Sequence, residues 1–121
     1  ASLEAIAFQS ADVLQSIAKD TGQEIKELRI DGGAAANDFL CSFQADVLGL
    51  DVKRPRILET TAMGAAFLAG LSVGVWQDQQ QISKMWKQKK MFSPNISRED
   101  SARMMEGWCR AVERAKEWLV F

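Results

Sequence analysis

Apolar residues recur at spacings of three and four along the first part of the chain, which predicts an amphipathic helix reaching about Lys19. This stripe consists of Leu3, Ile6, Ala7, Val13, Leu14 and Ile17. Gly22 follows as the expected C-terminal cap, because glycine readily adopts the left-handed conformation that ends helices. The helical pattern begins directly after Ala1, so we expect a chain that was cut close to or inside a helix.

The next stretch alternates between strand and helix patterns. Residues 25–30 predict a strand with Leu28 and Ile30 on one face, and Leu50 to Lys53 predict a second strand that Pro55 ends. Between them, a double glycine leads into a helical pattern closed by Gly49, whose apolar positions are Phe39, Leu40, Phe43, Val47 and Leu48. Strand, crossover helix and strand together predict one parallel βαβ unit.

A third helix is expected from Ala62 to about Val73, with Thr60 or Thr61 as its cap. It is apolar on every side, which predicts a buried helix. The spacing of Gly70 and Gly74 favours close packing and a helix end.

The chain then becomes polar from Trp76 to Phe92, where a short amphipathic surface helix is expected. Its apolar positions are Ile82, Met85 and Trp86, and its lysines (Lys84, Lys87, Lys89 and Lys90) are interpreted as a solvated face. Ser97 and Asp100 form a capping signal for a last helix of about 20 residues. Its apolar stripe is Ala102, Met105, Trp108, Cys109, Val112, Ala115 and Leu119, and Trp108 and Trp118 are expected to anchor its docking.

Composition narrows the class of protein. The 121 residues are 47% hydrophobic with a formal net charge of -1, which fits one domain with a real core and argues against a nucleic-acid-binding surface. The longest uncharged apolar run, Ala62 to Trp76, is too short to span a membrane. Cys41 and Cys109 are far apart and lie in helical patterns, so buried free thiols in a cytoplasmic protein are expected.

Candidate chemistry centres on the double glycine. A helix that begins after Gly32 and Gly33 directs free N–H groups at an approaching ligand, which suits a nucleotide, although a turn that needs glycine for geometry alone fits equally well. The pattern is neither a Walker A loop nor a dinucleotide fingerprint. The chain has no histidine, and no two of its carboxylates have the spacing of an acid–base pair; those considered are Asp31, Asp38, Asp46 and Glu59. We therefore expect no catalytic residue and no metal ligand here. Two predicted strands are too few for a stable sheet, so the chain reads as half of a nucleotide-binding α/β domain.

Two long runs carry a family resemblance. Residues 28–49 (LRIDGGAAANDFLCSFQADVLG) and 59–76 (ETTAMGAAFLAGLSVGVW) closely resemble the glycerol kinases of the FGGY carbohydrate kinase family. The resemblance covers nearly the whole chain and implies an actin-like, ribonuclease H-like ATPase fold. It implies that residues 1–121 are the C-terminal part of the second, nucleotide-binding domain. The glycerol pocket, the catalytic aspartate and the phosphate loop of this family belong to an N-terminal domain that is not present.

The resemblance also implies which residues bind the nucleotide. Gly33 would approach the adenosine of ATP with its backbone, and Asn37 would hydrogen-bond the adenine end, with Gly32 and Asp31 as weaker supporting candidates. A helix cap is the alternative role for Asn37. The intact enzyme would use ATP with Mg²⁺ to phosphorylate glycerol, whereas the present chain alone is expected to be inactive. Its partners would be the nucleotide, glycerol and the rest of the kinase chain, with no nucleic acid and no membrane.

Other hypotheses remain open at this point. The acceptor of the intact kinase could be a pentose or a sugar acid, or the chain could be an interaction module that reuses the fold without turnover. Residues 95–99 depart from the segment that docks a regulatory phosphocarrier protein in enteric relatives, so that regulation is not carried over. The bare strand edge and apolar helices also predict that the isolated chain associates with itself.

Overall fold

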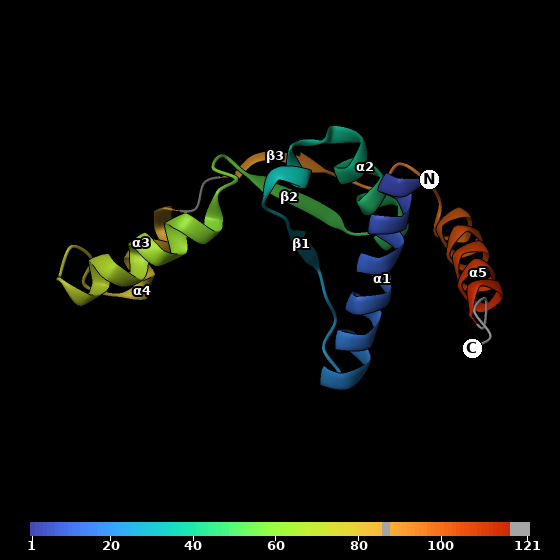
Figure 1. The fold of residues 1–121 in the computed structure, drawn as a ribbon, viewed down its shortest axis with the longest axis horizontal. Coiled ribbons are helices and arrows are strands. Elements are labelled where there is room, and N and C mark those ends of the chain that lie inside the picture. The colour runs from blue at the N-terminus through green and yellow to red at the C-terminus, as the bar shows by residue number, and fades with distance from the viewer. Residues whose placement is uncertain (86–87, 117–121) are drawn as a thin grey trace, which may run out of the picture.

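The computed structural model describes residues 1–85 and 88–116. Their elements follow in the order α1 (Ser2–Thr21), β1 (Glu27–Arg29), α2 (Asp38–Leu48), β2 (Asp51–Pro55), α3 (Thr60–Ser72), α4 (Gln79–Met85), β3 (Gln88–Phe92) and α5 (Arg98–Ala115). A 3₁₀ turn, Gly33–Ala36, lies between β1 and α2. Figure 1 shows the sheet at the centre with α1 and α2 beside it, α3 and α4 projecting from one end, and α5 standing at the other.

The sheet has three strands in the order β1-β2-β3. β1 and β2 are parallel, with Leu28 opposite Val52, so the predicted βαβ unit is confirmed. β3 adds an antiparallel strand, with Phe92 opposite Val52. The sequence analysis predicted only two strands, because four of the five residues of β3 are exposed and only Phe92 is buried. Such a lysine-bearing edge strand lacks the apolar alternation that identifies a half-buried strand.

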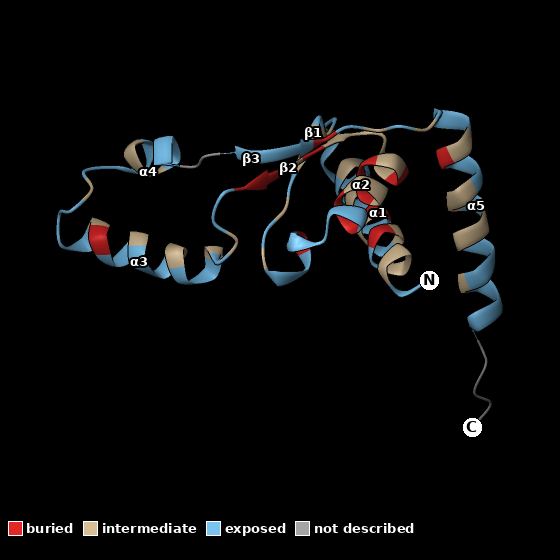
Figure 2. Ribbon diagram, turned by 90° about the horizontal axis from the view of Figure 1, so that it is seen from above, coloured by how far each residue is buried: buried red, intermediate tan, exposed pale blue. Residues whose placement is uncertain are grey.

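The core lies between the sheet and α2. Its buried residues are Cys41, Ala45, Val52 and Phe92, and Leu28 and Ile30 pack against them, as their predicted common face requires. α1 then covers α2: Ala7 and Ala11 are buried, and the Phe8 and Phe43 rings meet edge to face at 5.5 Å. Figure 2 shows that the buried residues concentrate in β2, α1 and α2.

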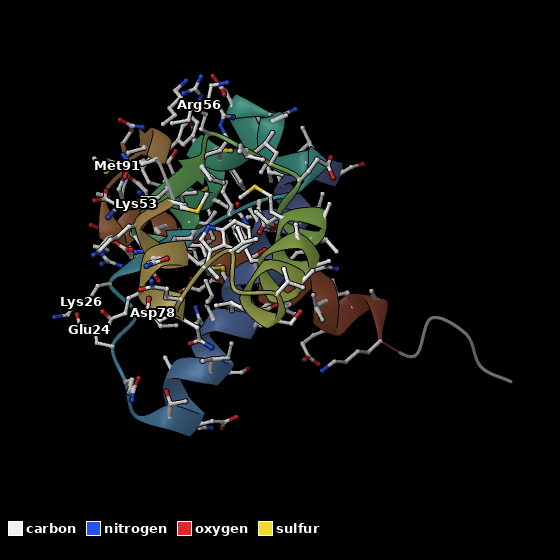
Figure 3. The ribbon with its side chains drawn as sticks, turned by 90° about the vertical axis from the view of Figure 1, so that its left-hand side faces the viewer. Glu24, Lys26, Lys53, Arg56, Asp78 and Met91 are labelled. Carbon is white, nitrogen blue, oxygen red and sulfur yellow. The ribbon has the colours of Figure 1, made fainter. Side chains whose placement is uncertain are left out.

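The opposite face of the sheet has a different character. Lys53 and its cross-strand neighbour Met91 lie beside each other there (Figure 3). Lys53 and Arg29 both form ion pairs with Glu27 on this face. The two hydrogen bonds from these cations hold the pKa of Glu27 below its ordinary value. Charged pairs thus occupy the face that α1 and α2 leave uncovered.

Both predicted glycine caps are confirmed. Gly22 ends α1 with φ 64°, and Gly49 ends α2 with φ 61°, the left-handed region that favours glycine. At Gly49 a side chain would also meet the guanidinium of Arg98 within 2.3 Å. This close approach joins the end of α2 to the start of α5.

The prediction that α3 is buried is wrong for the described chain. Gly70 is its one buried residue, whereas Leu68 is 70% exposed and the following Val73 is 75% exposed. The predicted close packing of Gly70 is confirmed, because a Cβ there would lie 1.9 Å from the Trp76 ring. Neither threonine caps the helix: Glu59 is the N-cap residue and makes no side-chain cap hydrogen bond. An apolar composition shows that a helix needs a cover without showing which segment supplies it.

The remaining predictions concern α4 and α5. α4 confirms the short surface helix after Trp76, although Trp86 and Lys87 lie outside the described residues. At the start of α5, the Ser97 hydroxyl accepts a hydrogen bond from the Asp100 N–H at 3.0 Å, which confirms the cap. Trp108 is an anchor: it stacks on Phe8 and donates from Nε1 to Asp12 at 2.7 Å. Trp118 and Leu119 also lie outside the described residues.

Candidate functional site

The glycine-rich loop connects the end of β1 to the start of α2. Gly32 has φ 81° and ψ 175°, so glycine is required there, and its N–H donates to the Leu58 carbonyl at 2.9 Å. The 3₁₀ turn follows, and Asn37 in extended conformation separates it from α2. The prediction that α2 begins directly after the glycines is therefore wrong by one turn.

Asn37 is the N-cap of α2. Its Oδ1 accepts a hydrogen bond from the Leu40 N–H at 3.1 Å, which is the helix-cap role that the sequence left as an alternative. The cap uses only the oxygen of the amide. The amide nitrogen carries two further hydrogens, and the residue is exposed. One residue can thus hold the helix end and still offer a donor to a ligand.

The two glycines leave the loop backbone open. A Cβ built at Gly32 or at Gly33 would meet no protein atom within 4 Å. Packing therefore does not explain Gly33, whose φ is not in the left-handed region either. The loop backbone at Gly33 therefore borders open space in the described structure.

Asp31 links this loop to α3. Its carboxylate accepts a hydrogen bond from the Thr60 hydroxyl in the first turn of that helix. The Leu58 carbonyl accepts from the N–H groups of both Gly32 and Thr60. Asp31 and Gly32 therefore hold the loop against the start of α3.

Arg54 lies beneath the loop, and the sequence analysis did not identify it. It is 7% exposed, and its Nη1 lies 2.8 Å from the Ala35 carbonyl and 3.1 Å from the Ala36 carbonyl. The same nitrogen is 2.8 Å from Asp38 Oδ1. The sequence does contain a signal for its burial: Arg54 lies two residues after the buried Val52, and side chains two residues apart in a strand share a face.

The ionisable groups around this loop are shifted by their neighbours. Hydrogen bonds from Lys90 and Arg54 hold the pKa of the Asp38 carboxyl below its ordinary value. Cys41 is a core residue, as predicted, and its burial raises the pKa of the thiol. Cys109 is exposed on α5, which contradicts the prediction that both cysteines are buried.

A hollow of about 680 Å³ lies between α2 and α5, lined in part by Val47, Met105 and Cys109, and no residue of the glycine loop borders it. Among residues 1–85 and 88–116, no three His, Cys, Asp or Glu side chains cluster as a metal site would require. No helix of the same residues is long and apolar enough to cross a membrane.

Curated relatives match the chain from one end to the other. The glycerol kinase of Dechloromonas aromatica is 54% identical over 118 residues, which are 98% of this chain and 24% of that protein. The glycerol kinase of Deinococcus radiodurans is 51% identical over the same shares. The chain thus spans about a quarter of the length of the curated relatives it matches.

Solved structures of related kinases have the same fold. The Plasmodium falciparum glycerol kinase with ADP superposes with a TM-score of 0.80 at 31% identity, covering 97% of this chain and 24% of that one. The xylulose kinase of Lactobacillus acidophilus gives a TM-score of 0.78 at 21% identity, covering 96% of this chain and 24% of that one. The fold is therefore the expected α/β, actin-like, ribonuclease H-like ATPase fold.

The C-terminal domain of the FGGY family of carbohydrate kinases matches residues 1–73. These residues contain α1, the βαβ unit, the glycine loop and α3. The chain belongs to the FGGY family of carbohydrate kinases.

Proposed function

We propose that this chain is the adenosine-binding, C-terminal portion of an ATP-dependent glycerol kinase. Within that enzyme, residues 1–121 form the C-terminal part of the second actin-like domain. Identity of about half to glycerol kinases over nearly all residues supports glycerol as the acceptor. The resemblance to xylulose and gluconate kinases, at 21% and 20% identity, supports the common fold alone.

The geometry of the glycine loop carries the proposal. Gly33 presents backbone without a side chain, and a Cβ there would enter space that no described protein atom fills. The adenosine of ATP occupies this space, with the amide nitrogen of Asn37 donating to an acceptor at the adenine end. Asn37 Oδ1 remains on the Leu40 N–H, so binding does not require the cap to break. Gly32 and Asp31 hold the loop on α3 rather than contacting the base.

The intact enzyme transfers the terminal phosphoryl group of ATP to a hydroxyl of glycerol and releases ADP and glycerol 3-phosphate. The described residues contribute nucleotide binding and orientation, and positioning together with charge stabilisation makes up most of catalysis in phosphoryl transfer. Magnesium in such a reaction is held mainly by the nucleotide phosphates and water with one or two protein carboxylates, and no cluster of three His, Cys, Asp or Glu side chains lies among residues 1–85 and 88–116. By the family resemblance, the base and the acceptor pocket belong to the remainder of the enzyme. A cytoplasmic location, where ATP is available, fits this reaction.

The experiment is a coupled assay on the full-length protein that contains this chain, with ATP and each of glycerol, xylulose and gluconate. We expect turnover with glycerol in the usual kinase range of about 1–100 s⁻¹ and much weaker reaction with the other acceptors. The 121-residue chain by itself should give no turnover. Preference for xylulose or gluconate would overturn the acceptor assignment, and nucleotide binding without transfer to any acceptor would favour an interaction module.

A further inference from the structure

Arg54 is a buried cation that the proposed reaction does not use directly. It belongs to β2, beneath the glycine loop, and only 7% of it is exposed. A buried guanidinium is costly unless charged and polar partners surround it. The groups that surround Arg54 therefore indicate the role of this residue.

Two of those partners are backbone carbonyls of the loop itself. Nη1 donates to Ala35 O at 2.8 Å and to Ala36 O at 3.1 Å, and these are the two residues before Asn37. Along a regular helix such carbonyls would accept from N–H groups further along the chain. Arg54 occupies them instead, which fits the break between the 3₁₀ turn and α2 at which Asn37 stands.

The charge of Arg54 is balanced by the residue that follows Asn37 in the chain. Asp38, the first residue of α2, lies 2.8 Å from Nη1, and the guanidinium lies over the Phe92 ring at 5.2 Å from its centroid. Arg54 thus contacts the two residues before Asn37 and the one after it. Charge-assisted hydrogen bonds of this kind are stronger than neutral ones and fix direction.

We propose that Arg54 is a positioning residue for nucleotide recognition: it fixes the backbone on both sides of Asn37 and thereby aims the Asn37 amide. This inference rests on the proposed adenosine site, and Arg54 itself does not touch the nucleotide. Loss of the guanidinium frees the Ala35 and Ala36 carbonyls and lets the turn relax, so that the amide no longer meets the adenine. The effect falls on ATP binding and leaves acceptor binding alone.

Lys90 provides a matched control. Like Arg54, it forms an ion pair with Asp38, at 2.6 Å, and lies over the Phe92 ring, at 4.7 Å. Unlike Arg54, it is half-exposed and has no hydrogen bond to the loop carbonyls in the described structure. Arg54→Met and Lys90→Met therefore remove the same pairing with Asp38 and Phe92, and only the first removes the support of the loop.

The test measures KM for ATP, KM for glycerol and the dissociation constant for ADP in the full-length enzyme. We expect Arg54→Met to raise the ATP and ADP constants about tenfold, the loss of one to two hydrogen bonds, with the glycerol KM unchanged. Arg54→Lys, which keeps a donor and the charge, should recover part of the loss. Lys90→Met should remain within about twofold of wild type. A double variant tests the mechanism. In the Arg54→Met background, Asn37→Ala should have little further effect, because residues that act through one network of contacts are non-additive.

Three outcomes would overturn the inference. ADP binding by folded Arg54→Met as tight as in wild type would do so, as would additive effects of Arg54→Met and Asn37→Ala. If Arg54→Met does not fold, Arg54→Lys decides: an ADP constant equal to that of wild type contradicts the role, and a raised constant at unchanged melting temperature supports it. The proposed function fails separately, when Asn37→Ala leaves ADP binding intact in an otherwise wild-type enzyme.

Discussion

Asn37 caps α2, and we propose that the same side chain also contacts the nucleotide. Its oxygen satisfies the Leu40 N–H at the start of α2, and its nitrogen remains for a ligand. A helix cap and a nucleotide contact were competing interpretations of this residue in the sequence, yet the geometry makes them compatible. The two atoms of the amide have opposite hydrogen-bonding character, so each task has its own atom.

Replacing Asn37 with serine and with alanine separates these tasks. Serine retains a hydroxyl oxygen that caps the helix but has no amide nitrogen, whereas alanine has neither. We expect Asn37→Ser to keep the melting temperature of the full-length protein and to weaken ADP binding about tenfold. Asn37→Ala should show the same weakening and in addition lose about 1 kcal/mol of stability. Calorimetric titration and thermal unfolding measure the two quantities, and wild-type ADP affinity in Asn37→Ser would reduce Asn37 to a cap.

At the scale of elements, the sequence identified those helices and strands whose buried positions recur at a regular spacing. α1, α2, β1 and β2 were predicted with their order and the parallel pairing, because alternating apolar positions and glycine caps mark them. β3 was missed since it is an edge strand whose partner, β2, lies far away in sequence. Pairing at such a distance leaves no signal within five mostly polar residues.

The residues of the candidate site also differ in whether a local sequence pattern could identify them. Gly32 and Gly33 were singled out because a double glycine between a strand and a helix is itself a local pattern, whereas the nucleotide role of Asn37 was implied only by the family resemblance. Arg54 was not singled out, since its relation to the loop exists only once β2 lies beside β1 and under the turn. The break between the 3₁₀ turn and α2 was not predicted either. Contacts from another strand accompany this break, and the sequence of the loop itself does not indicate them.

α3 shows where composition is insufficient. Its uniform apolar character correctly indicates a helix that is unstable in water without a cover. In the described chain that cover is absent from much of it, and α3 and α4 project from the sheet (Figures 1 and 2). The burial of a helix depends on the segments that pack against it, and the apolar pattern within the helix does not identify those segments.

At the scale of the whole molecule, the exposed apolar residues predict the behaviour of the isolated chain. Leu68, Val73 and Val75 on and after α3 are 66–75% exposed, and Ile6, Val13 and Ile17 of α1 are also exposed. We expect the 121-residue chain to associate with itself through these surfaces, burying more than about 1,000 Å² in total. Light scattering after size exclusion measures this state.

Matched substitutions locate the contact. Leu68→Lys should shift the isolated chain toward monomer, whereas Met85→Lys on the polar helix α4 should not. A wild-type chain that remains monomeric at high micromolar concentration would contradict the prediction. It would mean that the exposed patches are too small to hold two copies together.

The central claim is that adenosine binds on the glycine loop, and calorimetric titration of ADP into the full-length protein tests it most directly. Gly33 and Gly107 form a matched pair, because a Cβ at either position meets no protein atom within 4 Å and neither has a left-handed φ. We predict that Gly33→Val weakens ADP binding by at least about tenfold, since its branched side chain occupies the place of the nucleotide, while Gly107→Val binds like wild type. Equal ADP affinity in folded Gly33→Val and wild type would contradict the account.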